Sequence, residues 1–257
     1  GFFGIMMFGE GRVSRKMHFF ATCIVALGAY ISTFWILASN SWMQTPAGYA
    51  IENGRFIPEN WWHVIFNPSQ PFRFVHMSLA ALIATAFVVA GIAAWHLYRN
   101  NRDTVARKML SMALWMLTFA VPLQIVAGDV HGLNTLEHQP AKVAALEAHW
   151  ETEKGAALAL FAWPDAEAET NHYEISVPNM ASLILMHDWD GELVGLKEFP
   201  ASERPPVAPI FFSFRLMVGL GILMLIAGLT GLWLAFRGRL FDARGYHRYL
   251  VAMAPSG

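Results

Sequence analysis

The sequence is poor in charged side chains and almost without cysteine. Only 14% of its 257 residues are charged, whereas an ordinary soluble domain carries about 25%. The formal net charge is −1, so there is no basic excess with which to bind a nucleic-acid backbone, and we expect no nucleic-acid partner. The single cysteine, Cys23, excludes an intrachain disulfide and a multi-cysteine metal site.

Long apolar runs make up much of the chain. Hydrophobic residues account for 55% of the sequence, and four runs reach the roughly 20 residues that a helix needs to cross a bilayer. None of them contains Asp or Glu, so the spans lack the groups that a proton relay through the membrane needs. The runs lie at about 17–39, 74–98, 109–128 and 209–236.

The predicted fold is an all-α transmembrane helical bundle with four complete spans. The apolar ends of the chain are typical of two truncated terminal helices, and the N-terminus has neither an initiator Met nor a signal-peptide layout. We therefore expect an interior fragment of a longer protein. Its predicted parts are transmembrane helices over 1–128, an external loop segment over 129–208, and a last span with the start of a further helix over 209–257.

The basic residues predict the orientation, because short loops rich in Lys and Arg stay on the cytoplasmic side. Segments 43–70 and 129–208 should therefore face outside. In a bacterium this predicts a multi-pass inner-membrane protein with both segments in the periplasm. Three alternating loops hold 11 of the 18 basic residues: Arg12, Arg15 and Lys16; Arg99, Arg102, Arg107 and Lys108; Arg237, Arg239, Arg244 and Arg248.

Segment 129–208 differs in composition from the rest of the chain. It contains 14 of the 19 acidic residues and only four basic ones, so we expect it to lie in water. A helix is predicted from Pro140 to about Glu153, because proline suits a first helical turn and good helix formers follow. Residues 172–178 have a partial strand-like alternation. A connector of this length is usually functional, which favours an external module.

Two side chains within the spans have the chemistry to bind a haem iron. His76 is five residues past Pro71, and Met217 is eight past Pro209, about 8 and 12 Å along their helices. Both helices start on the outer side, so an imidazole and a thioether lie at similar depth, as in a six-coordinate electron-transfer haem. From spacing alone, a packing histidine and a filler methionine are simpler explanations.

Arg215 also lies inside a span. Its long side chain would either reach toward the outer surface or bind a haem propionate. It is two positions from Met217 and therefore on roughly the opposite helix face, which weakens the second role.

Several long motifs together resemble subunit I of the cytochrome bd quinol:oxygen oxidases. The modest length of the external segment resembles the short-loop members, which include the cyanide-insensitive oxidases. The motifs occur in the family's order and cover nearly the whole chain: GRVSRKMHFFATCIVALGAYISTFWILASNSWMQTP (11–46), FRFVHMSLA (72–80), KVAALEAHWET (142–152), GLKE (195–198) and PIFFSFRLMVGLG (209–221).

The resemblance implies roles for individual residues. His76 and Met217 match the axial ligands of a low-spin haem b, and Arg215 matches an arginine near that haem. Asn40 matches a polar residue near the other haems. The quinol loop of the family takes part in quinol oxidation through two residues that match Lys142 and Glu147. On an ideal helix these two are about 140° apart, so they should not pair with each other.

The resemblance also implies cofactors and partners. A full-length subunit would carry a second haem b and haem d, oxidise ubiquinol or menaquinol, and assemble in membrane lipid with subunit II and a small accessory subunit. Two alternatives stay open at this point. One is another membrane cytochrome b that anchors a quinone-linked dehydrogenase, and the other is a haem-free transporter or scaffold.

Overall fold

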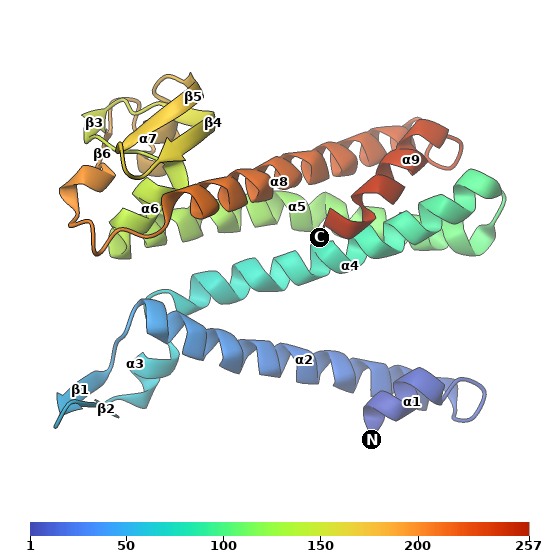
Figure 1. The fold of residues 1–257 in the computed structure, drawn as a ribbon. Coiled ribbons are helices and arrows are strands. Elements are labelled where there is room, and N and C mark those ends of the chain that lie inside the picture. Colours follow the sequence, from blue (N-terminus) through green and yellow to red (C-terminus); the bar gives the residue numbers. More distant parts are fainter. Residues whose placement is uncertain (257) are drawn as a thin grey trace. The chain divides into compact units, whose positions relative to one another are not determined.

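A computed structural model describes residues 1–256 (Figure 1). The chain forms two compact units, which divide after Ser78, inside the long helix α4 (Gln70–Arg99). Four helices are long and apolar enough to cross a membrane, so all four predicted spans are confirmed as helices. Besides α4 they are α2 (Arg15–Gln44), α5 (Thr104–His138) and α8 (Val207–Phe236).

The first unit contains α2 and a small substructure after its carboxyl end. A short helix, α1 (Phe2–Phe8), packs on α2, whose first turn is capped by the Ser14 side chain. After α2, strands β1 (Tyr49–Glu52) and β2 (Arg55–Pro58) form an antiparallel hairpin. Its turn is Asn53-Gly54, both with positive φ, as a tight hairpin requires. Helix α3 (Trp61–Ile65) then leads to α4.

The second unit has its larger core among long helices. Helix α8 packs along α5, and α9 (Arg244–Met253), followed by η2 (Ala254–Ser256), packs back on α8. The Tyr246 hydroxyl of α9 donates to the Ala227 carbonyl of α8 at 2.9 Å. The most deeply buried apolar residues of this core include Phe87, Leu97, Leu110, Leu117, Ala227 and Leu250.

The segment between α5 and α8, which is predicted to be external, has its own mixed structure. Helix α5 continues through Pro122 to His138, ten residues beyond the predicted end of its span. The predicted helix from Pro140 is α6 (Pro140–Glu147), so the expected end near Glu153 was wrong. The predicted strand is β5 (Thr170–Val177), and it pairs antiparallel with β4 (Leu158–Asp165).

Short elements complete this segment. Strand β3 (Glu153–Lys154) pairs with β6 (Glu192–Leu193), helix α7 (Met180–Met186) lies between β5 and β6 in the chain, and η1 (Leu196–Glu198) follows. A small core joins the segment to the start of α8. Its buried residues include Ala144, Trp150, Ala159, Leu196 and Phe211.

Candidate functional site

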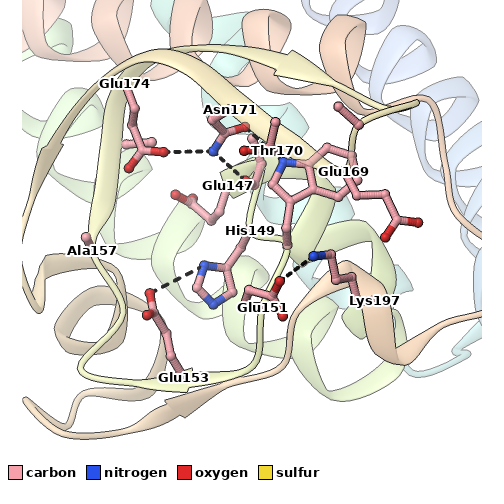
Figure 2. Close-up of a pocket in the computed structure, with 14 residues that line it drawn as sticks. Glu147, His149, Glu151, Glu153, Ala157, Glu169, Thr170, Asn171, Glu174 and Lys197 are labelled. Atoms are coloured by element: carbon pink, nitrogen blue, oxygen red, sulfur yellow. Dashed lines mark hydrogen bonds and ion pairs between the residues drawn. The ribbon is translucent and has the colours of Figure 1, made fainter.

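A cavity of about 350 Å³ lies in this segment, at the carboxyl end of α6 (Figure 2). Its volume is at the lower end of the range for small-molecule sites, about 300–1,000 Å³. The residues that follow α6, strands β4 and β5, and η1 supply the walls. The polar side chains that line it are Glu147, His149, Glu151, Glu153, Glu169, Thr170, Asn171, Glu174 and Lys197.

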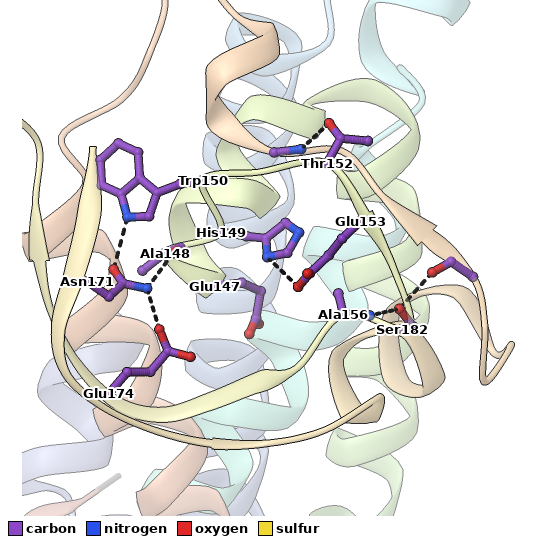
Figure 3. Close-up of polar contacts among 12 residues, drawn as sticks. Glu147, Ala148, His149, Trp150, Thr152, Glu153, Ala156, Asn171, Glu174 and Ser182 are labelled. Carbon is purple, nitrogen blue, oxygen red and sulfur yellow. Dashed lines mark hydrogen bonds and ion pairs between the residues drawn. The ribbon is translucent and has the colours of Figure 1, made fainter. Parts of the chain in front are cut away.

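A left-handed residue ends α6 and sets the direction of the next side chains. Ala148 has φ 52° and ψ 40°, and the His149 N–H after it donates to the Ala144 carbonyl at 2.8 Å. Such a conformation costs a non-glycine residue roughly 1–2 kcal/mol. Figure 3 shows the result: the His149 ring is directed toward Glu153, and the Trp150 ring toward Asn171.

Main-chain bonds to η1 hold this turn in place. The carbonyl of His149 accepts from the Leu196 N–H at 2.9 Å, and that of Trp150 accepts from the Lys197 N–H at 3.0 Å. Gly195 permits this close approach, because a Cβ at that position would clash with the Trp150 carbonyl oxygen.

Glu147 is buried and ion-paired. The Nη2 atom of Arg215, on α8, lies 2.5 Å from Glu147 Oε2, and Nη1 lies 3.5 Å from Oε1. The same guanidinium donates through Nε to the Ala159 carbonyl of β4 at 2.6 Å. Arg215 therefore reaches from its span into segment 129–208.

Lys142 does not line the cavity. It lies on α6 and is partly exposed, whereas Glu147, at the end of the same helix, lines the cavity wall. The structure therefore brings Glu147, but not Lys142, to the candidate site. The predicted roles of both residues in quinol oxidation stay predictions.

Asn171 connects two sides of the cavity. Its amide nitrogen donates to the Ala148 carbonyl at 3.0 Å and to Glu174 Oε2 at 2.9 Å. Its oxygen accepts from Trp150 Nε1 at 3.0 Å. These bonds tie β5 to the turn after α6 (Figure 3).

Three carboxylates around the cavity have a cationic partner. The pair from Arg204 to Glu169 lowers the pKa of that carboxylate below its ordinary value, chiefly through a hydrogen bond. These contacts offset part of the negative charge that the cavity lining carries. The pairs are Lys197 with Glu151, Arg204 with Glu169, and Arg215 with Glu147.

The His149 side chain is almost fully enclosed. The residue is 9% exposed, and its Nε2 atom is buried without a hydrogen-bond partner among the described residues. Its Nδ1 atom lies 4.0 Å from Glu153 Oε1. Burial lowers the pKa of His149 below 6.5, although Glu153, the Leu193 carbonyl, Glu147 and Glu174 act to raise it. The neutral imidazole is therefore the dominant form at pH 7.

The predicted haem ligands fall in different units of the chain. His76 is a half-buried residue of α4 in the first unit. Met217 of α8 is 50% exposed, and nothing lies within 4 Å of the place where a Cβ would stand on Gly219 or Gly221. The exposed Met217 thioether and the open surface at the two glycines leave room for a flat macrocycle such as haem. An imidazole together with a thioether is a ligand set that haem iron accepts.

Asn40 has a neighbour that the sequence did not reveal. Arg73 of α4 donates from Nη1 to Asn40 Oδ1 at 3.2 Å, and the Arg73 Nε atom is buried without a hydrogen-bond partner in the described part of the chain. Arg73 is three residues before His76, so the two side chains share a helix face.

His149 and Asn171 were not predicted as site residues. The available signal for His149 was its place in the KVAALEAHWET motif, two residues after Glu147. Nothing in the sequence marks Asn171, because its contacts with Ala148 and Trp150 exist only once β5 has folded back onto the turn after α6.

The whole chain is similar to one protein family. Residues 1–257 match the family described as cytochrome bd terminal oxidase subunit I. A cytochrome bd ubiquinol oxidase subunit 1 of Bacillus subtilis (strain 168) is 33% identical over 98% of this chain and 56% of its own length. A cytochrome bd-II ubiquinol oxidase subunit 1 of Escherichia coli (strain K12) is 27% identical over 98% of this chain and 62% of its own length.

A solved structure agrees with these matches. The bd oxidase from Geobacillus thermodenitrificans superposes with a TM-score of 0.87 at 31% sequence identity, over 99% of this chain and 59% of that one. The chain thus spans less than two thirds of the length of each of these relatives. Its four apolar helices and these matches indicate a multi-pass bacterial membrane protein. Because the family match covers every residue of the sequence, this chain belongs to the cytochrome bd terminal oxidase subunit I family.

Proposed function

We propose that this chain is the part of a respiratory quinol:oxygen oxidoreductase that oxidises quinol at the outer face of the bacterial inner membrane. The electrons would pass to a low-spin haem b and on to an oxygen-reducing dihaem site formed mostly by other parts of the subunit. The observation that carries the proposal is a cavity beside α6 with Glu147 in its wall, in a chain of this family.

The family membership favours this function over the two alternatives. A dehydrogenase anchor or a haem-free transporter would have no reason to match a terminal oxidase subunit along its whole length. The relatives from Bacillus subtilis and Escherichia coli are ubiquinol oxidase subunits by name. We infer ubiquinol or menaquinol as the substrate of this chain.

Within the second unit, residues of this chain would bind the quinol and receive its protons. A buried carboxylate such as Glu147 is suited to hydrogen-bond a quinol hydroxyl, and Arg215 fixes its position. Lys142 lies on α6 outside the cavity lining, so its proposed role in quinol oxidation rests on the family resemblance alone.

His76 and Met217 would hold the low-spin haem. A haem bound by an imidazole and a thioether supplies one-electron redox chemistry at a raised potential. Arg73, with its buried Nε atom, and Asn40 offer polar groups in the same unit as His76. By the family resemblance, a second haem b, haem d, subunit II and a small accessory subunit would complete the enzyme.

The ligand assignment is tested on the full-length, membrane-assembled enzyme by reduced-minus-oxidised spectra. His76→Ala and Met217→Leu should each abolish or shift the low-spin haem b signal. An unchanged signal in both variants would show that the two residues are not ligands.

The loop assignment is tested by turnover of the same enzyme. Lys142→Ala and Glu147→Ala should each lower quinol oxidation by about 100-fold, because each would remove a group that positions the quinol, and should leave the spectrum intact. Normal turnover in both variants would contradict this role.

A further inference from the structure

We propose that His149 accepts a proton from the quinol hydroxyl at its Nε2 atom and passes a proton from Nδ1 toward Glu153. The inference rests on the proposed quinol oxidation and adds a proton acceptor to that site. It is supported by the enclosure of the ring, the pairing of Glu147, the surrounding carboxylates and the position of Glu153.

The Nε2 atom of His149 has an unmet hydrogen-bonding capacity. It is buried and has no hydrogen-bond partner among residues 1–256, although the residue lines the cavity. A buried polar atom left without a partner costs roughly 1–3 kcal/mol. A ligand hydroxyl that donates to this nitrogen would remove that cost.

Glu147, the other buried ionisable group in the cavity wall, is already engaged. Its two carboxylate oxygens face the Arg215 guanidinium, at 2.5 and 3.5 Å. A proton placed on this carboxylate would weaken that ion pair. A proton placed on His149 Nε2 breaks no hydrogen bond in the described structure, so His149 is the better acceptor.

Burial favours the neutral imidazole of His149, whereas the carboxylates around the ring favour its protonated form. Burial outweighs the nearby carboxylates and keeps the pKa of His149 below 6.5, so the ring can accept a proton at pH 7. The same carboxylates stabilise the imidazolium once it forms. The carboxylates that raise the pKa of the ring are Glu153, Glu147 and Glu174. The other charged residues that line the cavity are Glu151, Glu169 and Lys197.

Glu153 is the group that would accept the proton released from His149 Nδ1. It is exposed, and its Oε1 atom lies 4.0 Å from the other ring nitrogen, Nδ1, a separation that a bridging water would span. An imidazole can take a proton on one nitrogen and release one from the other. His149 and Glu153 both line the cavity (Figure 2), and the Glu153 side chain is exposed, so a proton that reaches it can pass to water.

Oxidation of one quinol yields one quinone, two electrons and two protons. The oxidant is the ferric low-spin haem of the proposed function, which would take the two electrons of the quinol one at a time. For the first proton, the quinol O–H bond breaks and an N–H bond forms at His149 Nε2, while the Nδ1 proton goes to Glu153 and then to water. Exchange with water, which takes the Nε2 proton and returns one to Nδ1, restores the starting tautomer, and the second proton then takes the same route.

The test is the pH profile of quinol turnover by the full-length, membrane-assembled enzyme. In the wild type, turnover should fall as the pH drops through the pKa of His149, below 6.5, because the protonated ring accepts no proton. His149→Gln should lower kcat by about 100-fold and lose this acidic limb, with an unchanged haem spectrum. His172→Gln changes an exposed histidine of the same segment outside the cavity lining, and this matched control should behave like the wild type.

Two further variants separate catalysis from structure. Imidazole in the buffer should restore part of the turnover of His149→Gly, which a purely structural role would not allow. Glu153→Gln changes an exposed residue and should fold normally. Because Glu153 raises the pKa of His149, its removal should move the acidic limb to lower pH.

The proposal would be overturned if His149→Gln kept the turnover and the pH profile of the wild type. It would also be overturned if the acidic limb of Glu153→Gln stayed at the same pH as in the wild type. Either result would leave the proposed quinol oxidation standing. A wild-type enzyme that binds haem but oxidises no quinol would instead overturn the proposed function. The two failures are therefore distinguishable.

Discussion

Arg215 shows how a single residue joins two parts of the chain that are distant in sequence. It lies two positions before Met217 on α8, yet its guanidinium pairs with Glu147 of α6 and with the Ala159 carbonyl of β4. Sequence spacing placed it on the face opposite Met217 and left its partner open. The structure assigns that partner within segment 129–208, so a change at Arg215 should disturb the cavity wall.

Removing one member of this buried pair should destabilise the protein. Arg215→Gln leaves the Glu147 carboxylate buried without a countercharge, which costs about 3–5 kcal/mol. The Glu147 side chain is only 4% exposed, so water does little to compensate. Thermal unfolding of the purified full-length protein should show a lower midpoint for Arg215→Gln.

The double variant provides the control for that prediction. In Arg215→Gln combined with Glu147→Gln, neither charge of the pair remains buried, so the midpoint should recover part of the loss. A double variant whose losses simply add would mean that the two residues do not interact in the folded protein.

Helices and strands were predictable to different degrees. The spans were predictable because their length and apolar composition are local properties. The hairpin β1–β2 was not predicted, although Asn53-Gly54 is a strong turn signal, because its four-residue strands carry little periodicity. Helix α6 ends before the predicted residue because Ala148 adopts a left-handed conformation that an alanine in the sequence does not indicate.

Helix α5 is longer than its apolar run. It extends over 35 residues, about 52 Å, whereas the hydrocarbon core of a bilayer is about 30 Å thick. Its last turns include Asp129 and Glu137, and we expect them to lie in water and to carry α6 away from the membrane. Composition indicated where the apolar run ends, but it did not indicate where the helix ends.

Helix α9 packs on α8 closely enough to need a glycine there. A Cβ on Gly231 would clash with the Tyr246 hydroxyl and would approach Leu114 Cδ1 to 2.5 Å. Gly231→Ala should therefore displace the Tyr246 hydrogen bond to Ala227 and cost about 1–3 kcal/mol, measured as a lower unfolding midpoint.

Gly132→Ala is the matched control on α5. It adds the same methyl group in a helix at a position where nothing lies within 4 Å, and it should stabilise the helix by about 0.5–1 kcal/mol. Equal effects of the two substitutions would contradict the close packing of α9 on α8.

Across the whole molecule, the distribution of basic residues predicts which segments face outside. Glu167→Cys, at an exposed position in the turn between β4 and β5, should react with a membrane-impermeant maleimide in intact cells. Arg102→Cys, at an exposed position between α4 and α5, should react only after the membrane is opened. Both variants need Cys23→Ser, because Cys23 is itself exposed on α2.

The reverse labelling pattern would place segment 129–208 in the cytoplasm. Such a result would contradict the proposed release of quinol protons to the outside. The family membership would not change, because it rests on the match along the chain and not on sidedness.

The sequence by itself determined the four spans, the acidic segment between the last two, and the family, because these depend on composition and motif order along the chain. It also marked His76, Met217, Lys142 and Glu147, whose roles as haem ligands and quinol residues stay predictions. Only the tertiary structure decided which distant side chains meet. Arg215 meets Glu147 across 68 residues, and His149 lies in a cavity lined by β5 and η1, because packing between distant segments fixes those contacts and local sequence pattern does not.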